Sequence, residues 1–241
     1  MSKIYLTGSA GFIGSRLWSK LFDLGIETEN CDFKINRDIL SYDPGEVNVI
    51  YHLGAQAGAM PSWKDPMYDA RNNILATIKV CEIAKKNNAK IIFTTSGSAV
   101  EPESPYGISK QVCEKYLKLL HPNSVILRLS SIYGEKDRGV VDTFIRDDKC
   151  TIYGDGSATR DFVHVDDIVE ALIKAKDWEP GEYTLGSGKG TTVRELAEAT
   201  GKPIEYQEAR KGEKQEVVLE NTAPDWVPII SALDYIKAKC R

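Results

Sequence analysis

Apolar residues along this chain form two patterns that alternate from the N-terminus onward, short continuous runs and helical spacing. Short apolar runs over 4–6 and 47–53 predict buried strands, and 90–96 is interpreted as a further strand that ends in hydroxyl side chains. Apolar or small residues recur at helical spacing over 68–87, and a second helical pattern opens at residue 106. Strands that alternate with helices in this way predict an α/β fold with a parallel sheet.

A glycine-rich turn joins the first strand to the helix that follows it. One glycine allows a sharp turn, a second allows the backbone to approach a pyrophosphate, and a third allows the helix to pack on the strand. The N-terminus of that helix offers free N–H groups and a positive dipole end to phosphates. The turn therefore predicts a dinucleotide site with the candidate residues Gly8, Gly11, Phe12, Ile13 and Gly14.

Asp32 stands eighteen residues after Gly14, at the end of the next expected strand. A carboxylate at this distance accepts hydrogen bonds from both ribose hydroxyls of a dinucleotide. Its charge would repel a 2′-phosphate, which predicts NAD rather than NADP as the cofactor. Lys34 and Arg37 follow closely and weaken this preference.

Further candidate cofactor contacts lie in the loops after the second and third strands. Asp38 and Ile39 are placed to flank an adenine ring, and a surface turn is an equal alternative for them. The strand over 47–53 ends in a turn of small residues that leaves room for a dinucleotide. His52 within that strand is expected to be packed or hydrogen-bonded and receives no chemical role. The expected contacts after the strand are Leu53, Ala55 and Gln56.

Tyr106 and Lys110 are four residues apart and so lie on one face of the predicted helix. A neighbouring ammonium lowers the pKa of a phenol, which makes a phenolate accessible near neutral pH. The same lysine can reach a ribose hydroxyl. Behind a dinucleotide turn, the pair predicts a tyrosine general base.

Composition limits the classes of function. The 241 residues suffice for one large α/β domain or for a main domain with a small appendage. A net charge of −4 argues against nucleic acid or an acidic membrane as partners, so an anionic ligand must be held by local arginines. The five scattered cysteines suggest neither a disulfide framework nor a metal site. Without an apolar leader or a membrane-length apolar run, the chain is expected to be soluble and cytoplasmic.

The glycine pattern, Asp32, the hydroxyl-bearing strand end and Tyr-x-x-x-Lys, in that order, resemble the extended short-chain dehydrogenases/reductases. The segments IYGDG at 152–156 and RDFVHVDDI at 160–168 narrow the resemblance to the NAD-dependent nucleotide-sugar epimerases and dehydratases, which include UDP-glucose 4-epimerase. The resemblance extends from residue 3 to about residue 235.

This resemblance implies roles for individual residues. Tyr106 is expected to be the base, and Lys110 is expected to tune it and to hold the nicotinamide ribose. Ser96 is the expected hydroxyl donor to the substrate oxygen, with Ser98 as the alternative. Asn73 stands at the helix asparagine of the family and is taken as a cofactor contact. The expected substrate contacts are Ser131 and the two diphosphate arginines Arg160 and Arg210.

The implied reaction is 4-epimerisation of a nucleotide sugar through a transient 4-keto sugar, with UDP-glucose and UDP-galactose as the default pair. Gly97 and Ser98 stand where dehydratases carry an Asp-Glu pair, which argues against elimination of water. A UDP-uronate remains a second substrate, although residues 59–61 lack the arginine expected to meet its carboxylate. The resemblance also leaves open a UDP-N-acetylhexosamine as the substrate, a dehydratase or reductase activity, and a non-catalytic NAD-binding regulator.

The expected architecture is a doubly wound parallel sheet, a Rossmann fold, with a small C-terminal substrate-binding lobe. The NAD-binding domain is placed at 1–135, rejoined by about 160–186, and the substrate lobe lies mainly within 136–241. The stretches 32–47 and 100–106 are shorter than is usual in the family, which predicts a more open site. The family also implies a homodimer through the two helices over 68–87 and 106–120.

Overall fold

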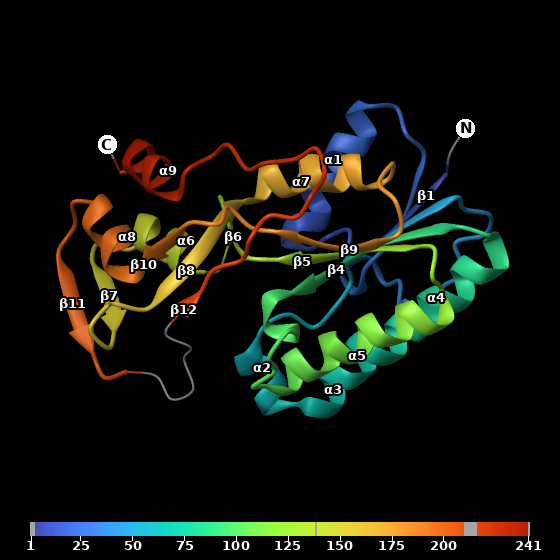
Figure 1. The fold of residues 1–241 in the computed structure, drawn as a ribbon, viewed down its shortest axis with the longest axis horizontal. Coiled ribbons are helices and arrows are strands. Elements are labelled where there is room, and N and C mark those ends of the chain that lie inside the picture. The colour runs from blue at the N-terminus through green and yellow to red at the C-terminus, as the bar shows by residue number, and fades with distance from the viewer. Residues whose placement is uncertain (1–2, 138, 210–215, 241) are drawn as a thin grey trace. The chain divides into compact units, whose positions relative to one another are not determined.

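The computed structural model describes residues 3–137, 139–209 and 216–240, and the chain divides into two compact units (Figure 1). The first unit comprises residues 1–128 and 172–183, and the second comprises 129–171 and 184–241. The sequence placed the first boundary at 135 and the return to the first domain over 160–186. In the structure, residues 160–171 group with the second unit instead.

A six-stranded sheet forms the centre of the first unit, with the order β2-β1-β3-β4-β5-β9. The pairings of β1 with β2, of β1 with β3 and of β3 with β4 are all parallel. This is the doubly wound sheet that the sequence predicted. The strands are β1 (Ile4–Thr7), β2 (Thr28–Cys31), β3 (Val49–His52), β4 (Lys90–Ser96), β5 (Ser124–Leu129) and β9 (Gly181–Leu185).

The strand order reverses at β1, because β2 lies on one side of β1 and β3 lies on the other. In the usual order of this fold a further strand lies beyond β2 before the chain crosses over. Here the short segment between β2 and β3 contains only the 3₁₀ turn η1 (Phe33–Ile35). Arg37 from this segment donates to the Asn30 carbonyl at 2.7 Å and thereby covers part of the β2 edge.

Helices cover both faces of this sheet (Figure 1). The helix α1 (Phe12–Asp23) packs on β1 and β2, whereas α4 (Ala76–Asn87) and α5 (Pro105–Leu120) pack on β3 and β4. The predicted helix over 68–87 is divided into α3 (Pro66–Ala70), a π-helical turn η2 (Arg71–Leu75) and α4. Two shorter elements complete the unit, α2 (Ala59–Lys64) and the 3₁₀ turn η3 (Gly97–Ala99).

The core of the first unit lies between the sheet and the pair α4 and α5. Apolar strand residues meet apolar helix residues there, and each fully buried large side chain contributes about 1.5–3 kcal/mol. Its members include Tyr5, Ile50, Ile91, Phe93, Val80, Cys113 and Leu117.

The second unit has its own core and two small sheets. In one sheet β8 pairs with β6, β10 and β12, and in the other β7 pairs with β11. The strands are β6 (Ser131–Tyr133), β7 (Cys150–Tyr153), β8 (Thr159–His164), β10 (Gly190–Thr192), β11 (Ile204–Gln207) and β12 (Glu216–Val217). The helices are α6 (Val140–Arg146), α7 (Val165–Ala175), whose end belongs to the first unit, α8 (Val193–Ala199) and α9 (Ala232–Lys239). None of the described helices is long and apolar enough to cross a membrane.

Candidate active site

The glycine turn after β1 tolerates no side chains at two of its positions. Gly8 has a φ of +71°, and a Cβ there would lie 2.7 Å from the Gly54 nitrogen. A Cβ on Gly14 would lie 2.0 Å from the Gly8 carbonyl oxygen. Gly11 caps α1 with extended backbone. The three glycines thus allow β1, α1 and the turn after β3 to approach closely, with the N-terminus of α1 at the turn.

A cavity of about 340 Å³ opens beside this turn, where the strand order reverses. Ligands of open α/β sheets bind at this position. The Oε1 atom of Gln56 is buried at the cavity without a hydrogen-bond partner, so an acceptor is available to a bound molecule. The residues that line the cavity, and its position in the fold, are suitable for binding part of a dinucleotide. The predicted residues that line it are Gly8, Gly11, Asp32, Ile39, Leu53, Ala55 and Gln56.

Asp32 is held at the cavity by two backbone donors. Its carboxylate accepts from the N–H of Ala10 at 3.1 Å and from the N–H of Lys34 at 2.9 Å. The Lys34 ammonium donates to the Ala10 carbonyl at 2.9 Å, and Arg37 binds Glu29 at 2.6 Å. Both neighbouring cations therefore have partners within the protein.

Asp38 and Ile39 face different surroundings. Ile39 lines the cavity. The two carboxylate oxygens of Asp38 accept from the Leu40 N–H at 3.0 Å and from the Arg71 guanidinium at 2.7 Å. Burial alone would raise the pKa of Asp38, but these two partners bring it below its usual value. The structure therefore shows Asp38 as the cap of a turn that Arg71 holds in place.

Asn73 lies in the π-helical turn η2 and is buried. Its Oδ1 accepts from the Gln56 N–H at 2.8 Å, and its Nδ2 is within 2.9 Å of oxygens of both Asp69 and Ser109. Its side chain thus holds the turn after β3 against α5, behind the cavity. The proposed contact between Asn73 and the cofactor stays a prediction.

His52 belongs to a hydrogen-bonded chain whose direction can be derived. Thr77 donates its hydroxyl proton to the Asn73 carbonyl at 2.7 Å, so it must accept from Nε2 of His52, which lies 3.1 Å away. The Nδ1 atom of His52 then accepts from the Thr7 hydroxyl at 2.8 Å, and Thr7 accepts from the Gly54 N–H at 3.0 Å. Burial and the charge of Lys110 lower the pKa of His52 to about 3. A neutral, hydrogen-bonded histidine confirms the interpretation of the sequence.

Tyr106 and Lys110 lie on α5, as the sequence predicted. The helix begins at Pro105 because the Ser104 hydroxyl accepts from the Gly107 N–H at 3.1 Å. Gly107 permits close packing, since a Cβ there would lie 2.8 Å from the Ser98 carbonyl oxygen. The start of α5 is thereby pressed against the turn that follows β4.

Of the two candidate hydroxyls, it is Ser96 that interacts with the Tyr106 phenol, and it lowers the pKa of that phenol. Ser96 ends β4 and is half-buried, whereas Ser98 is exposed in η3. Ser96 therefore has the position required of a donor to an oxygen that reacts beside Tyr106. Which serine contacts a substrate stays a prediction.

The electrostatics of Tyr106 differ from the expectation drawn from its sequence spacing. Burial raises the pKa of Tyr106 to about 12, the Ser96 hydroxyl lowers it in part, and the carboxylate of Asp69 raises it further. The ammonium of Lys110 is turned toward β4, where it donates to the Thr94 carbonyl at 2.9 Å and lies 4.7 Å from the centre of the Phe93 ring. The structure therefore does not show the lowering of the Tyr106 pKa by Lys110 that the spacing predicted.

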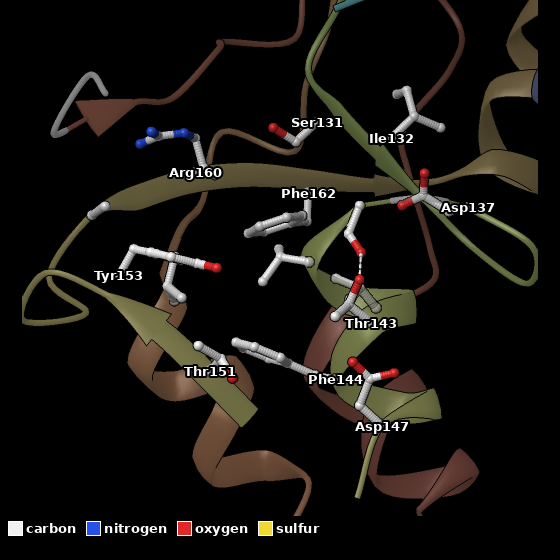
Figure 2. A pocket seen from close by; sticks show the side chains of 15 residues that line it. Ser131, Ile132, Asp137, Thr143, Phe144, Asp147, Thr151, Tyr153, Arg160 and Phe162 are labelled. Carbon is white, nitrogen blue, oxygen red and sulfur yellow. Dashed lines mark hydrogen bonds between the residues drawn. The ribbon is translucent and has the colours of Figure 1, made fainter. Parts of the chain in front are cut away.

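A second cavity, of about 500 Å³, lies within the second unit (Figure 2). Two of the predicted substrate contacts line it, Ser131 from β6 and Arg160 from β8. Figure 2 shows Arg160 near Phe162, while Phe144 and Asp147 come from the end of α6 and the residue after it. Arg210, the other predicted diphosphate ligand, lies outside the described residues.

Two buried residues near Tyr106 were not identified as site residues from the sequence. The Ser62 hydroxyl, fully buried on α2, accepts the Tyr106 N–H at 3.0 Å. Asp69 on α3 is only 1% exposed and influences Tyr106 electrostatically. Both belong to stretches that carry no chemical motif, and only the packing of these helices on α5 brings them to the site.

The parallel sheet, its glycine turn, the carboxylate beyond β2 and the cavity at the reversal of strand order define a dinucleotide-binding protein of the doubly wound α/β class. The chain belongs to the NAD dependent epimerase/dehydratase family, which matches residues 4–186. NAD is accordingly its cofactor.

Named relatives cover nearly the whole chain. It is 30% identical to the UDP-glucose 4-epimerase of Mycolicibacterium smegmatis, over 90% of this chain and 89% of that protein. The fold is similar to that of UDP-glucose 4-epimerase of Thermotoga maritima, solved with UDP-glucose (TM-score 0.85, 28% identity, 99% of this chain and 97% of that one). It is also similar to UDP-glucuronic acid 4-epimerase of Bacillus cereus, solved with UDP-glucuronic acid and NAD (TM-score 0.86, 26% identity, 99% and 98% covered).

The alignment with the Mycolicibacterium relative runs over 280 positions, although this chain has only 241 residues. The relative therefore has internal segments that this chain lacks. This agrees with the prediction of shortened loops.

Proposed function

We propose that this protein is an NAD-dependent UDP-sugar 4-epimerase that interconverts UDP-glucose and UDP-galactose. The observation that carries the proposal is the pair Tyr106 and Lys110, one turn apart on α5, beside the end of β4, where Ser96 interacts with the Tyr106 phenol and lowers its pKa. A base and a hydroxyl donor at one oxygen are what oxidation of a sugar hydroxyl requires. The 4-epimerase relatives support the same activity.

In this proposal Tyr106, as the phenolate, takes the proton of the sugar 4-hydroxyl. NAD, held at the cavity by the glycine turn and Asp32, would supply the acceptor and donor of the C4 hydride, and its positively charged ring would favour the phenolate. Ser96 donates a hydrogen bond to the 4-oxygen while that oxygen becomes a carbonyl. Rotation of the 4-keto sugar exposes its other face, and Tyr106 gives its proton back as the hydride returns. The reaction is redox-neutral overall.

The second unit is proposed to bind the nucleotide part of the substrate, and the first unit is proposed to bind NAD. Arg160 and Ser131 line the 500 Å³ cavity, which supports a role for the Arg160 guanidinium in binding the diphosphate. Arginine binds phosphate oxygens through charge-assisted hydrogen bonds, which explains how a chain of net charge −4 can hold an anion. Arg210 is proposed as a second ligand.

A neutral hexose is favoured over a uronate because the start of α2 consists of Ala59, Met60 and Pro61, which carry no cation. UDP-glucuronic acid stays the alternative, since the Bacillus cereus protein of similar fold has that substrate. Gly97 and Ser98 supply no acid and base for elimination across C5 and C6, which makes a dehydratase the weaker candidate.

The deciding experiment follows the anomeric proton NMR signals of UDP-galactose mixed with the purified protein, with and without added NAD. We expect signals of UDP-glucose to appear and Tyr106→Phe to abolish them while NAD still binds. If the protein turns over UDP-glucuronic acid but not UDP-galactose, the proposed substrate is the uronate and not the neutral hexose. NAD binding without turnover of any UDP-sugar would leave a non-catalytic regulator, and consumption of added NADH would indicate a reductase.

We also propose a homodimer that pairs α4 and α5 with the same helices of a second copy. Leu75 in the turn before α4 and Ile108 on α5 are each 52% exposed, although both are large and apolar. Sedimentation velocity should show a dimer that Ile108→Glu converts to monomers. A monomeric wild type would refute this part of the proposal.

A further inference from the structure

Two cations, Lys34 and Arg37, line the cavity beside the glycine turn, a few residues after Asp32. In dinucleotide-binding folds of this class, an arginine near the acidic residue after the second strand accommodates the 2′-phosphate of NADP. Lysine and arginine both bind phosphate oxygens through charge-assisted hydrogen bonds. By position alone, these cations would favour NADP, against the preference for NAD that Asp32 sets.

The Arg37 guanidinium, however, is bound to β2 within the protein. Its Nη1 atom donates to Oε1 of Glu29 at 2.6 Å and to the Asn30 carbonyl at 2.7 Å. Since Nη1 carries two protons, these two contacts use both of them. The Glu29 carboxylate also compensates the positive charge of Arg37, because the two groups form an ion pair.

Tyr42 anchors this ion pair to the core of the first unit. Its hydroxyl donates to the same Oε1 atom of Glu29, and the Arg37 guanidinium lies 4.7 Å from the centre of its ring. The Tyr42 ring in turn stacks on the fully buried Tyr5 of β1, with 6.3 Å between the ring centres. An aromatic ring attracts a cation over its face. A carboxylate, a carbonyl and a ring therefore hold the guanidinium together.

Among the described residues that line the cavity, Asp32 and Lys34 carry the other two charges. These charges are opposite, and the Lys34 ammonium is bound to the Ala10 carbonyl at 2.9 Å. A 2′-phosphate would thus meet a cavity wall whose net charge depends on Arg37. Glu29 cancels the charge of Arg37 from outside the cavity lining.

We propose that Glu29 is a specificity-determining residue of the cofactor site, which withholds Arg37 from a 2′-phosphate and thereby disfavours NADP. Asp32 repels the phosphate directly, whereas Glu29 neutralises and holds back the cation that would attract it. The inference concerns the choice between NAD and NADP only. It therefore does not depend on which sugar is the substrate, nor on the proposed 4-epimerase activity.

The test is Glu29→Gln, which keeps an oxygen that accepts from Tyr42 and removes the charge. Glu27→Gln is the matched control, because Glu27 stands just before β2 and forms a surface ion pair with Lys3 at 3.7 Å. Isothermal titration calorimetry measures the Kd of NADH and of NADPH for each protein. We expect the wild type to prefer NADH. In Glu29→Gln, NADPH should bind roughly fivefold more tightly than in the wild type, as the loss of a half-exposed ion pair allows. The affinity for NADH should stay the same, and Glu27→Gln should change neither.

The double variant Glu29→Gln with Arg37→Gln shows whether the gain comes from the guanidinium. We expect it to bind NADPH no more tightly than the wild type does. If Glu29→Gln fails to fold, Glu29→Thr serves in its place, because threonine suits a strand. A gain that persists without Arg37 overturns the inference, since Glu29 would then act by its own repulsion alone. The inference is also overturned if the wild type binds both cofactors equally, or if Glu29→Gln changes NADPH binding no more than Glu27→Gln does. The expected shift in a protein that turns over no UDP-sugar supports the inference and refutes the proposed function.

Discussion

The ion pair between Glu114 and Arg128 allows a quantitative prediction about stability. The Glu114 side chain is only 4% exposed and that of Arg128 is 23% exposed. Arg128→Met keeps much of the side-chain volume but leaves a buried carboxylate without its partner, which costs about 3–5 kcal/mol in proteins. We take the lower end, about 3 kcal/mol, because the partial exposure of Arg128 lets water reach the vacated position.

For a chain of 241 residues, about 3 kcal/mol corresponds to a fall in Tm of roughly 6–12 °C. Differential scanning calorimetry at neutral pH measures it directly. The loss should shrink in mildly acidic buffer, because the unpaired Glu114 takes up a proton in the folded variant and the buried charge disappears.

The double variant Glu114→Gln with Arg128→Met separates this explanation from simple loss of packing. Removing both charges should restore part of the stability that Arg128→Met removes. The reasoning is refuted if Arg128→Met lowers Tm by less than about 2 °C, or if the double variant is less stable than the single one. Arg146→Met is the matched control, because that arginine is 64% exposed and its ion pairs are at the surface.

Three further predictions follow from the site. Tyr106→Phe should lower kcat at least about 100-fold with NAD affinity retained, because a positioned base contributes that much; NMR turnover and NAD titration measure the two effects. Gly14→Ala should abolish NAD binding or folding, since the new Cβ would lie 2.0 Å from the Gly8 carbonyl oxygen. Gly25→Asn is the control for the same binding assay. It should be tolerated, because Gly25 has a left-handed backbone and open space around it. The pKa of His52 is lowered to about 3, so below about pH 6.5 the unfolded chain binds a proton at His52 and the folded chain does not. The protein therefore loses stability between pH 8 and pH 5. Denaturant titrations should show that this loss is about 2 kcal/mol smaller in His52→Gln.

Several features of the fold were determined locally and could be read from the sequence. The glycine turn after β1 is required by close contacts that no side chain tolerates, so its spacing alone indicated the structure. The strand over 90–96 and the helix end at Asn87 also follow from local rules, since Asn88 adopts the left-handed conformation that ends a helix.

Other features depend on partners that are distant in the sequence. The π-helical turn at Asn73 has no sequence rule of its own, and its asparagine is fixed by contacts to Gln56 and Ser109. The direction of the hydrogen bonds around His52 depends on its contacts with both Thr7 and Thr77, which lie far from His52 in the sequence.

The sequence by itself determined the doubly wound fold, the NAD turn and the residues Tyr106 and Lys110, because local backbone geometry and helical spacing are properties of neighbouring residues. The tertiary structure decided the electrostatics of that pair. Burial against β4 raised the pKa of Tyr106 and turned Lys110 toward Thr94, and the packing of α3 on α5 brought Asp69 to the site. Burial and charge proximity are sums over residues far apart in the chain, so they exist only once the chain has folded.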